Sequence, residues 1–209
     1  MKAVVCQNAV LSVVELPEPV PGKAQVLLDV QRCGICGSDL HMRHHCDEFK
    51  AVVSKVGLGP VMPSSSDPVV FGHEFCAEVL EYGPGCDKKI KIGTRVVAQP
   101  VLRVGSQIHL AGLSPIATGA YAERMVLQET ALEPVPNGLS ADMAALTEPM
   151  AVGLHAVRRS EIKKRDTELA ELRAKVAESG ITQAKLEERL NILNQALTAP
   201  PPKSPEEQQ

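Results

Sequence analysis

The chain has 209 residues, enough for one good-sized domain or for one domain with an appendage. Its formal charge is -3, and no lysine- or arginine-rich stripe runs along any segment, so the electrostatic footprint of a nucleic-acid-binding protein is missing. No apolar run reaches the roughly 20 residues that a membrane-spanning helix needs. The proline-broken start does not resemble a signal peptide, so we expect a cytoplasmic protein without a membrane partner.

The first part of the chain predicts β structure. KAVVC, LSVVEL and QVLLDVQ are short, rich in valine and leucine, and separated by asparagine or proline. The pattern returns in VVFGHEFCAEVLEYGPG, IGTRVVAQPV and GAYAERMVL. Between Met42 and Pro68 the composition predicts an irregular loop. We therefore predict a mainly β domain, a barrel or sandwich, over residues 1–139, with functional residues on its loops.

Helices are expected next, over residues 140–166. Ser140 is a good N-cap, and Asp142 lies where the helix dipole favours an anion. Pro149 is expected to end or kink the first helix, and a second helix is expected to continue through His155.

The composition changes again near Thr167. Leucine and valine recur at alternating spacings of three and four over residues 167–198, which predicts a coiled-coil-like helix. Gly180 weakens that pattern and Thr182 is a candidate cap, so a helical hairpin is an equal alternative. Either form offers a route to a homo-oligomer. The proline-rich residues 199–209 are predicted to be disordered.

Residues 33–46, CGICGSDLHMRHHC, hold three cysteines and three of the six histidines. The CxxC pair of Cys33 and Cys36 is by itself a weak signal, because zinc knuckles need a second pair and redox pairs need a βαβ unit. His73 and Glu74 stand side by side in VVFGHEF. A thiolate, an imidazole and a carboxylate suit zinc, and three protein ligands with an open fourth position are typical of catalytic zinc.

In their order, these motifs resemble those of the zinc-containing medium-chain alcohol and polyol dehydrogenases. The family pattern CGxCGSDxH, then GHE, then a glutamate–proline pair is similar to CGICGSDLH, FGHEF and LTEPMAVGLHAV in this chain. The resemblance covers residues 1–166. It implies a GroES-like β-barrel domain, zinc and NAD(P) as cofactors, and a small alcohol or polyol as substrate.

The resemblance also implies a set of metal ligands. Cys36 would be the thiolate ligand, and His73 the imidazole ligand. Glu74 would be a direct ligand, or a neighbour that exchanges with water or substrate. Glu148 matches a position at which polyol dehydrogenase-like members have glutamate, bound directly or through water. Cys33 would be a buried spectator.

A proton relay through Ser38 and His41 is implied as well. Ionising an alcohol on zinc releases a proton, which must leave a largely dry pocket. Asp39 would steady a ligand imidazole. Without the zinc motif, Ser38 and Asp39 would be interpreted as turn formers.

The other cysteines and histidines have no implied role. His44, His45 and Cys46 fall in the predicted loop and are interpreted as surface residues rather than ligands. His109 and His155 are single histidines without a motif. Because the chain lacks an export signal, we expect burial rather than disulfides for Cys6, Cys76 and Cys86.

The sequence departs from the family in three places. Many members carry four closely spaced cysteines for a structural zinc, but AQPVLRVGSQIHLAGLSPIATGAY has none, so we expect one catalytic ion and no structural zinc. Cys36 and His73 lie further apart than is usual, so the intervening loop is expected to reshape the substrate entrance. No GxGxxG motif occurs, and no βαβ alternation follows Thr167.

These observations leave two hypotheses. The first is the zinc-binding catalytic domain of an alcohol or polyol dehydrogenase-type oxidoreductase, truncated before its Rossmann domain and therefore not competent alone. The alternative is a non-catalytic oligomerising or partner-binding protein, built on a vestigial dehydrogenase domain.

Overall fold

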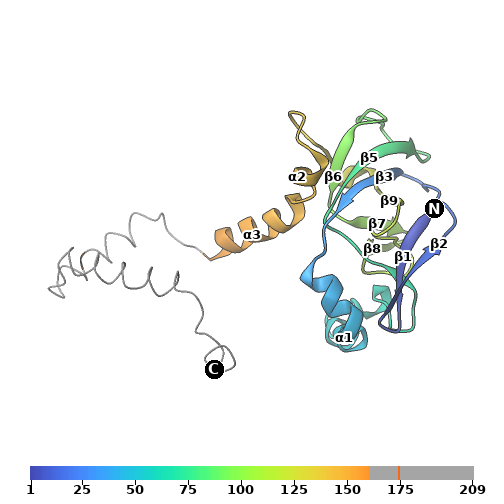
Figure 1. Ribbon diagram of the computed structural model, residues 1–209, viewed down its shortest axis with the longest axis vertical. Helices are drawn as coiled ribbons and strands as arrows, with labels where there is room; N and C mark the ends of the chain where they lie inside the picture. Colours follow the sequence, from blue (N-terminus) through green and yellow to red (C-terminus); the bar gives the residue numbers. More distant parts are fainter. Residues whose placement is uncertain (161–173, 175–209) are drawn as a thin grey trace, which may run out of the picture. The chain divides into compact units, whose positions relative to one another are not determined.

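The structure, a computed structural model, describes residues 1–160 and Ala174 (Figure 1). The strands are β1 (Lys2–Gln7), β2 (Val10–Glu15), β3 (Gln25–Cys33), β4 (Val69–Val70), β5 (Phe75–Tyr82), β6 (Arg95–Ala98), β7 (Val101–Val104), β8 (Gln107–Leu110), β9 (Arg124–Gln128) and β10 (Leu132–Pro134). The α-helices are α1 (Gly37–Ser54), α2 (Ala141–Ala144) and α3 (Thr147–Arg159), and two 3₁₀ turns are η1 (Gly59–Val61) and η2 (Glu129–Ala131).

An antiparallel five-stranded sheet, in the order β10-β6-β5-β3-β9, forms the centre of the unit Met1–His155. A second sheet has the order β2-β1-β4, and β7 and β8 form a hairpin. The main core lies on the central sheet, where fully buried side chains include Val26, Leu28, Val79, Met125 and Leu127. Each such side chain stabilises the fold by roughly 1.5–3 kcal/mol. The prediction of a mainly β domain is confirmed.

The prediction of an irregular loop from Met42 to Pro68 is wrong over its first part, because α1 runs from Gly37 to Ser54. Met42 and Cys46 are four residues apart, so they share one face of the helix, and both are buried in a small cluster with Phe71. The remaining α1 positions are largely polar and exposed, which obscured the helical period. The backbone of α1 is kinked at His45, where φ is -128° and ψ is 29°.

The prediction that Cys46 is a surface loop residue is also wrong. Cys46 is buried, and its Sγ donates to the Pro63 carbonyl oxygen at 3.4 Å. His44 and His45 are exposed, but they lie on α1 rather than in a loop.

Cys6 and Cys76 are buried as expected, with exposed fractions of 5% and 0%. Cys86 is only half-buried, and its Sγ donates to the Gln25 carbonyl oxygen at 3.2 Å. All six cysteines lie in the described part of the chain and are free thiols.

The expected N-cap at Ser140 is confirmed, because its Oγ accepts a hydrogen bond from Met143 N. The helix break, however, falls between Ala144 and Thr147 rather than at Pro149. Pro149 lies in the first turn of α3, where the N–H that proline lacks has no partner within the helix.

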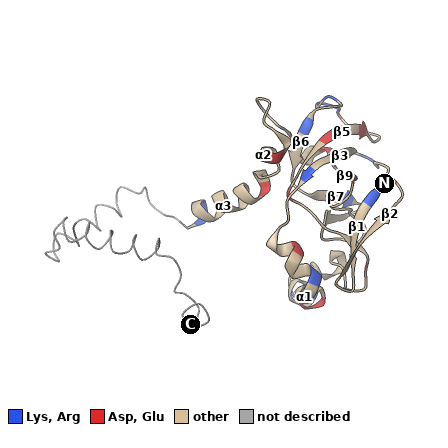
Figure 2. Cartoon of the chain, viewed as in Figure 1, with Lys and Arg blue, Asp and Glu red and all other residues tan. Residues whose placement is uncertain are grey.

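Apart from Ala174, the leucine-striped segment 167–198 and the tail 199–209 lie outside the described residues, so both remain predictions. Among the helices that the structure describes, none is both long and apolar enough to cross a bilayer. Basic residues are interspersed with acidic ones over the described elements (Figure 2).

Candidate metal centre

The pairing of β3 with β5 brings two distant segments together. In this antiparallel pair Cys33 lies opposite Phe75. The chain leaving β3 and the chain entering β5 therefore run side by side, and the Gly34 N–H donates to the Glu74 carbonyl oxygen at 2.7 Å. Cys36, at the start of α1, thus comes close to His73 and Glu74.

The ligand atoms of Cys36, His73 and Glu74 all lie within 4.8 Å of one another. Within the described residues, no other group of three or more histidine, cysteine or acidic side chains converges in this way. One sulfur, one nitrogen and one oxygen donor at this spacing fit zinc, and leave one tetrahedral position open.

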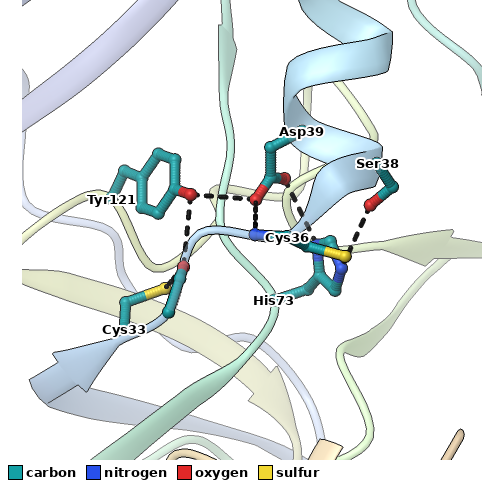
Figure 3. Close-up of polar contacts among 7 residues, drawn as sticks. Cys33, Cys36, Ser38, Asp39, His73 and Tyr121 are labelled. Atoms are coloured by element: carbon teal, nitrogen blue, oxygen red, sulfur yellow. Dashed lines mark hydrogen bonds and ion pairs between the residues drawn. The ribbon is translucent and has the colours of Figure 1, made fainter. Parts of the chain in front are cut away.

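Asp39 orients the imidazole of His73 (Figure 3). Its Oδ1 lies 3.4 Å from His73 Nδ1, and both side chains are buried. The Asp39 carboxylate raises the pKa of His73 to about 9, against the opposing effect of burial. Burial alone raises the pKa of Asp39, but hydrogen bonds from His73 and Tyr121 outweigh it and lower that pKa. A carboxylate at Nδ1 leaves Nε2 as the nitrogen available to a metal.

Asp39 is also tied to the start of α1. The backbone N–H of Cys36 donates to Asp39 Oδ2 at 3.1 Å, which is the return half of a capping box. One carboxylate therefore positions two of the three candidate ligands, through the Cys36 backbone and the His73 ring.

Sequence reasoning missed Tyr121, which completes this network. Its hydroxyl donates to Asp39 Oδ2 at 2.9 Å and also lies 3.2 Å from the Gly34 carbonyl oxygen. Burial, followed by the hydrogen bond to Asp39, raises the pKa of Tyr121, so the hydroxyl stays protonated and remains a donor. No local pattern marks this tyrosine, because its partners are far away in the sequence.

Replacing Tyr121 with phenylalanine removes one donor from the buried Asp39 carboxylate and retains the ring. We expect a loss of stability of about 1–3 kcal/mol and zinc affinity lower by about tenfold. Urea denaturation and competition with a zinc chelator measure the two effects. Tyr82→Phe is the matched control, because the Tyr82 hydroxyl donates to the Ile90 carbonyl oxygen, away from the candidate ligands. Equal zinc affinities for all three proteins would contradict the role of Tyr121.

The two predicted relay residues lie at the outer edge of the site. Ser38 Oγ is 3.3 Å from His73 Nε2. His41, one helical turn further along α1, is exposed, and its ring stacks on that of His45 with centroids 4.9 Å apart.

Cys33 is half-buried and does not belong to the group of converging donors. Burial, followed by the charges of Asp39 and Glu74, raises the pKa of its thiol to about 12. Its Sγ donates to the Gly34 carbonyl oxygen at 3.3 Å. Because its Sγ lies outside the converging donors, the spectator role of Cys33 stays a prediction.

Glu148 is not among the converging donors either. It lies in the first turn of α3 and lines a cavity of about 500 Å³ together with Phe75, Val97, Thr130 and His155. Phe75, which lines this cavity, is the residue directly after the candidate ligand Glu74 in the sequence.

The protein is thus a β domain with a candidate metal site where β3, β5 and α1 meet. The site offers one sulfur, one nitrogen and one oxygen donor. The Alcohol dehydrogenase GroES-like domain family matches residues 22–137 of the sequence. The chain therefore belongs to this family, and the resemblance seen in its motifs is confirmed.

Among curated proteins, (R,R)-butanediol dehydrogenase of Bacillus subtilis is 35% identical over 164 residues, which are 73% of this chain and 44% of that protein. Sorbitol dehydrogenase of Halalkalibacterium halodurans is 31% identical over 167 residues, 74% of this chain and 44% of that protein. The chain thus spans less than half the length of these relatives.

Solved structures of dehydrogenases also resemble this chain in fold. The crystal structure of the 2R,3R-butanediol dehydrogenase from Bacillus subtilis superimposes with a TM-score of 0.62 at 31% identity, covering 78% of this chain and 48% of that one. A Sinorhizobium meliloti 1021 protein assigned as a zinc-binding dehydrogenase and bound to NADP has a TM-score of 0.61 at 30% identity, covering 78% of this chain and 46% of that one.

Proposed function

We propose that the described domain is the zinc-binding catalytic domain of an alcohol or polyol dehydrogenase-type oxidoreductase. The observation that carries this proposal is the convergence of Cys36, His73 and Glu74 within 4.8 Å. The buried Asp39 beside His73 supports it, because a carboxylate next to the far ring nitrogen of a ligand imidazole is a usual outer partner of a zinc-bound histidine.

Cys36, His73 and Glu74 would hold the ion. When bound, zinc supplies Lewis-acid polarisation of an alcohol or carbonyl oxygen. Asp39 Oδ1, 3.4 Å from His73 Nδ1, would hold the proton on Nδ1 when the metal takes Nε2.

Ser38 and His41 would carry the proton outward. Ser38 Oγ is 3.3 Å from His73 Nε2, at the edge of the donor group, where it can accept the proton that a substrate hydroxyl loses while it passes its own hydroxyl proton on toward His41. His41 lies one helical turn beyond it and is exposed, so its imidazole can pass the proton to bulk water.

The reaction proposed for the whole protein is the NAD(P)-dependent oxidation of a small alcohol or polyol. Relatives named butanediol and sorbitol dehydrogenases support the substrate class, and the NADP-bound relative supports the cofactor. These relatives are more than twice as long as the part matched here. We propose that the nicotinamide is held outside these 209 residues, among which no GxGxxG motif occurs.

Zinc analysis of the purified full chain tests the proposal. We expect one zinc ion per chain to survive dialysis, because three protein ligands with an oriented imidazole retain the ion. Elemental analysis after gel filtration measures the ratio, and far-UV circular dichroism shows that the protein is folded. A folded chain that takes up no zinc when zinc is supplied would overturn the assignment.

The roles of Glu74 and Glu148 are separable by substitution. We expect Glu74→Gln to lower zinc affinity by at least about tenfold, and the matched Glu148→Gln to lower it much less, since only Glu74 lies among the converging donors. Chelator competition measures both affinities. If Glu148→Gln has the larger effect, Glu148 is the carboxylate ligand and Glu74 the neighbour.

The alternative, a non-catalytic oligomerising or partner-binding protein, depends on the leucine-striped segment, which lies outside the described residues. The family match and the converging donors favour the enzymatic domain instead. Oligomerisation through that segment remains a prediction. Sedimentation of the full chain tests it.

A further inference from the structure

The stretch RHHC and its flanking residues form a second histidine cluster, which supplies no ligand to the proposed zinc site, although His41 is also the outer residue of the proposed relay. His41, His44, His45 and Glu48 lie at i, i+3, i+4 and i+7 along α1. Although α1 is kinked at His45, contacts of the His45 ring with His41 and Glu48 keep these three side chains together. All four residues are exposed.

The rings of His41 and His45 already lie against each other. Their centroids are 4.9 Å apart and their planes make an angle of 28°. The His45 side chain is 48% exposed, so it can turn toward a shared ion without displacing a packed core. Two histidines four residues apart on one helix face are a recurrent metal-binding arrangement.

Glu48 holds the His45 ring in a tautomer and orientation that suit a metal ligand. Its Oε2 lies 3.0 Å from His45 Nδ1. An ionised carboxylate only accepts hydrogen bonds, so Nδ1 carries the proton and Nε2 keeps a free lone pair. This is the carboxylate–histidine pairing that fixes the tautomer and ring orientation of a ligand imidazole.

We propose that His41 and His45 bind a divalent transition-metal ion on the surface of α1, with Glu48 orienting His45. The remaining coordination positions would be taken by water, since within the described residues only Cys36, His73 and Glu74 bring three donors together. Imidazole ligands select Cu²⁺, Ni²⁺ and Zn²⁺ over Mg²⁺ and Ca²⁺, and Cu²⁺ should bind most tightly. Cys46 takes no part, because it is buried and bonded to Pro63.

With two protein ligands against three, the proposed site should bind a metal more weakly than the zinc site, and the two sites share no ligand. It would empty on dialysis, so it does not alter the expected ratio of one retained zinc ion. The proposal does not depend on the dehydrogenase function, because it uses only the exposed side chains of α1.

Calorimetric titration of the full chain with Ni²⁺, after loading with one equivalent of zinc, tests the proposal. We expect one further equivalent of Ni²⁺ to bind, and Mg²⁺ not to bind. His41→Gln and His45→Gln should each weaken Ni²⁺ binding by at least about tenfold, and Glu48→Gln by about tenfold. His155→Gln, at an exposed histidine of α3, is the matched control and should leave the Ni²⁺ affinity unchanged.

Two controls separate this site from the zinc site. Cys36→Ser is expected to lose the retained zinc yet still bind one Ni²⁺, whereas the double variant His41→Gln/His45→Gln should retain zinc and lose Ni²⁺. Circular dichroism confirms that each variant is folded. The proposal would be overturned if the folded double variant kept its Ni²⁺ affinity, or if Cys36→Ser bound no Ni²⁺. Neither result would contradict the assignment of zinc to Cys36, His73 and Glu74.

Discussion

Cys36→Ser is expected to abolish zinc retention, whereas Cys33→Ser should leave it intact. Cys36 provides the one thiolate among the converging donors, and loss of a direct ligand costs more than the roughly 10–100-fold in affinity that loss of an outer partner costs. Serine is a favourable N-cap residue, so the start of α1 should survive the substitution, and the loss can be assigned to the metal.

Replacing zinc with cobalt shows directly whether a cysteine sulfur is bound to the metal. A thiolate bound to Co²⁺ produces a charge-transfer absorption band in the near ultraviolet. We expect this band in the wild type and in Cys33→Ser, and its absence in Cys36→Ser. Cys33→Ser is a matched control, because it removes the other sulfur of the same CxxC pair. The reverse pattern would exchange the roles of the two cysteines.

Gly72→Ala, next to His73, should be strongly destabilising. Gly72 has φ +95°, and a Cβ there would meet Tyr121 Cδ1 at 2.7 Å, Cys33 Sγ at 2.9 Å and the Tyr121 backbone nitrogen at 2.9 Å. Left-handed strain of about 1 kcal/mol and overpacking of about 1–3 kcal/mol add to an expected loss of about 2–4 kcal/mol. Since His73 is the next residue, zinc affinity should fall as well.

Gly105→Ala is the control that measures the left-handed backbone strain without the overpacking. Gly105 also has positive φ, +60°, but a Cβ there would meet nothing within 4 Å. It should cost about 1 kcal/mol, from strain alone. Urea denaturation of the zinc-free proteins compares the two variants. Equal losses would show that crowding at Gly72 contributes nothing.

The sequence was sufficient to predict the mainly β domain, because valine- and leucine-rich segments bounded by glycine and proline carry that signal locally. It also singled out Cys36, His73 and Glu74, because their residue types and motif order are visible in single stretches. The structure confirms the mainly β domain and places the three donor atoms within 4.8 Å of one another, while their role as metal ligands stays a prediction.

The helix α1 was missed for a physical reason. Its buried face within the predicted loop consists of Met42 and Cys46, set among polar residues, so the apolar period is too sparse to stand out. Its N-cap is Cys36, which is not a residue that signals a helix start. Burial against Phe71 favours the helix, and that contact is tertiary.

Tyr121 could not have been found from the sequence, because it lies 82 residues from Asp39 and no local motif marks it. The stacking of His41 on His45 likewise depends on α1, which was not predicted.

The sequence by itself determined which atoms are available for metal chemistry, since donor identity is a property of single side chains. Only the tertiary structure decided which donors meet. The pairing of Cys33 with Phe75 in adjacent strands aligns the segments on either side of the site, and Asp39, held by Tyr121, then fixes the orientation of His73. Proximity between distant residues depends on strand register and packing, which short-range patterns do not encode.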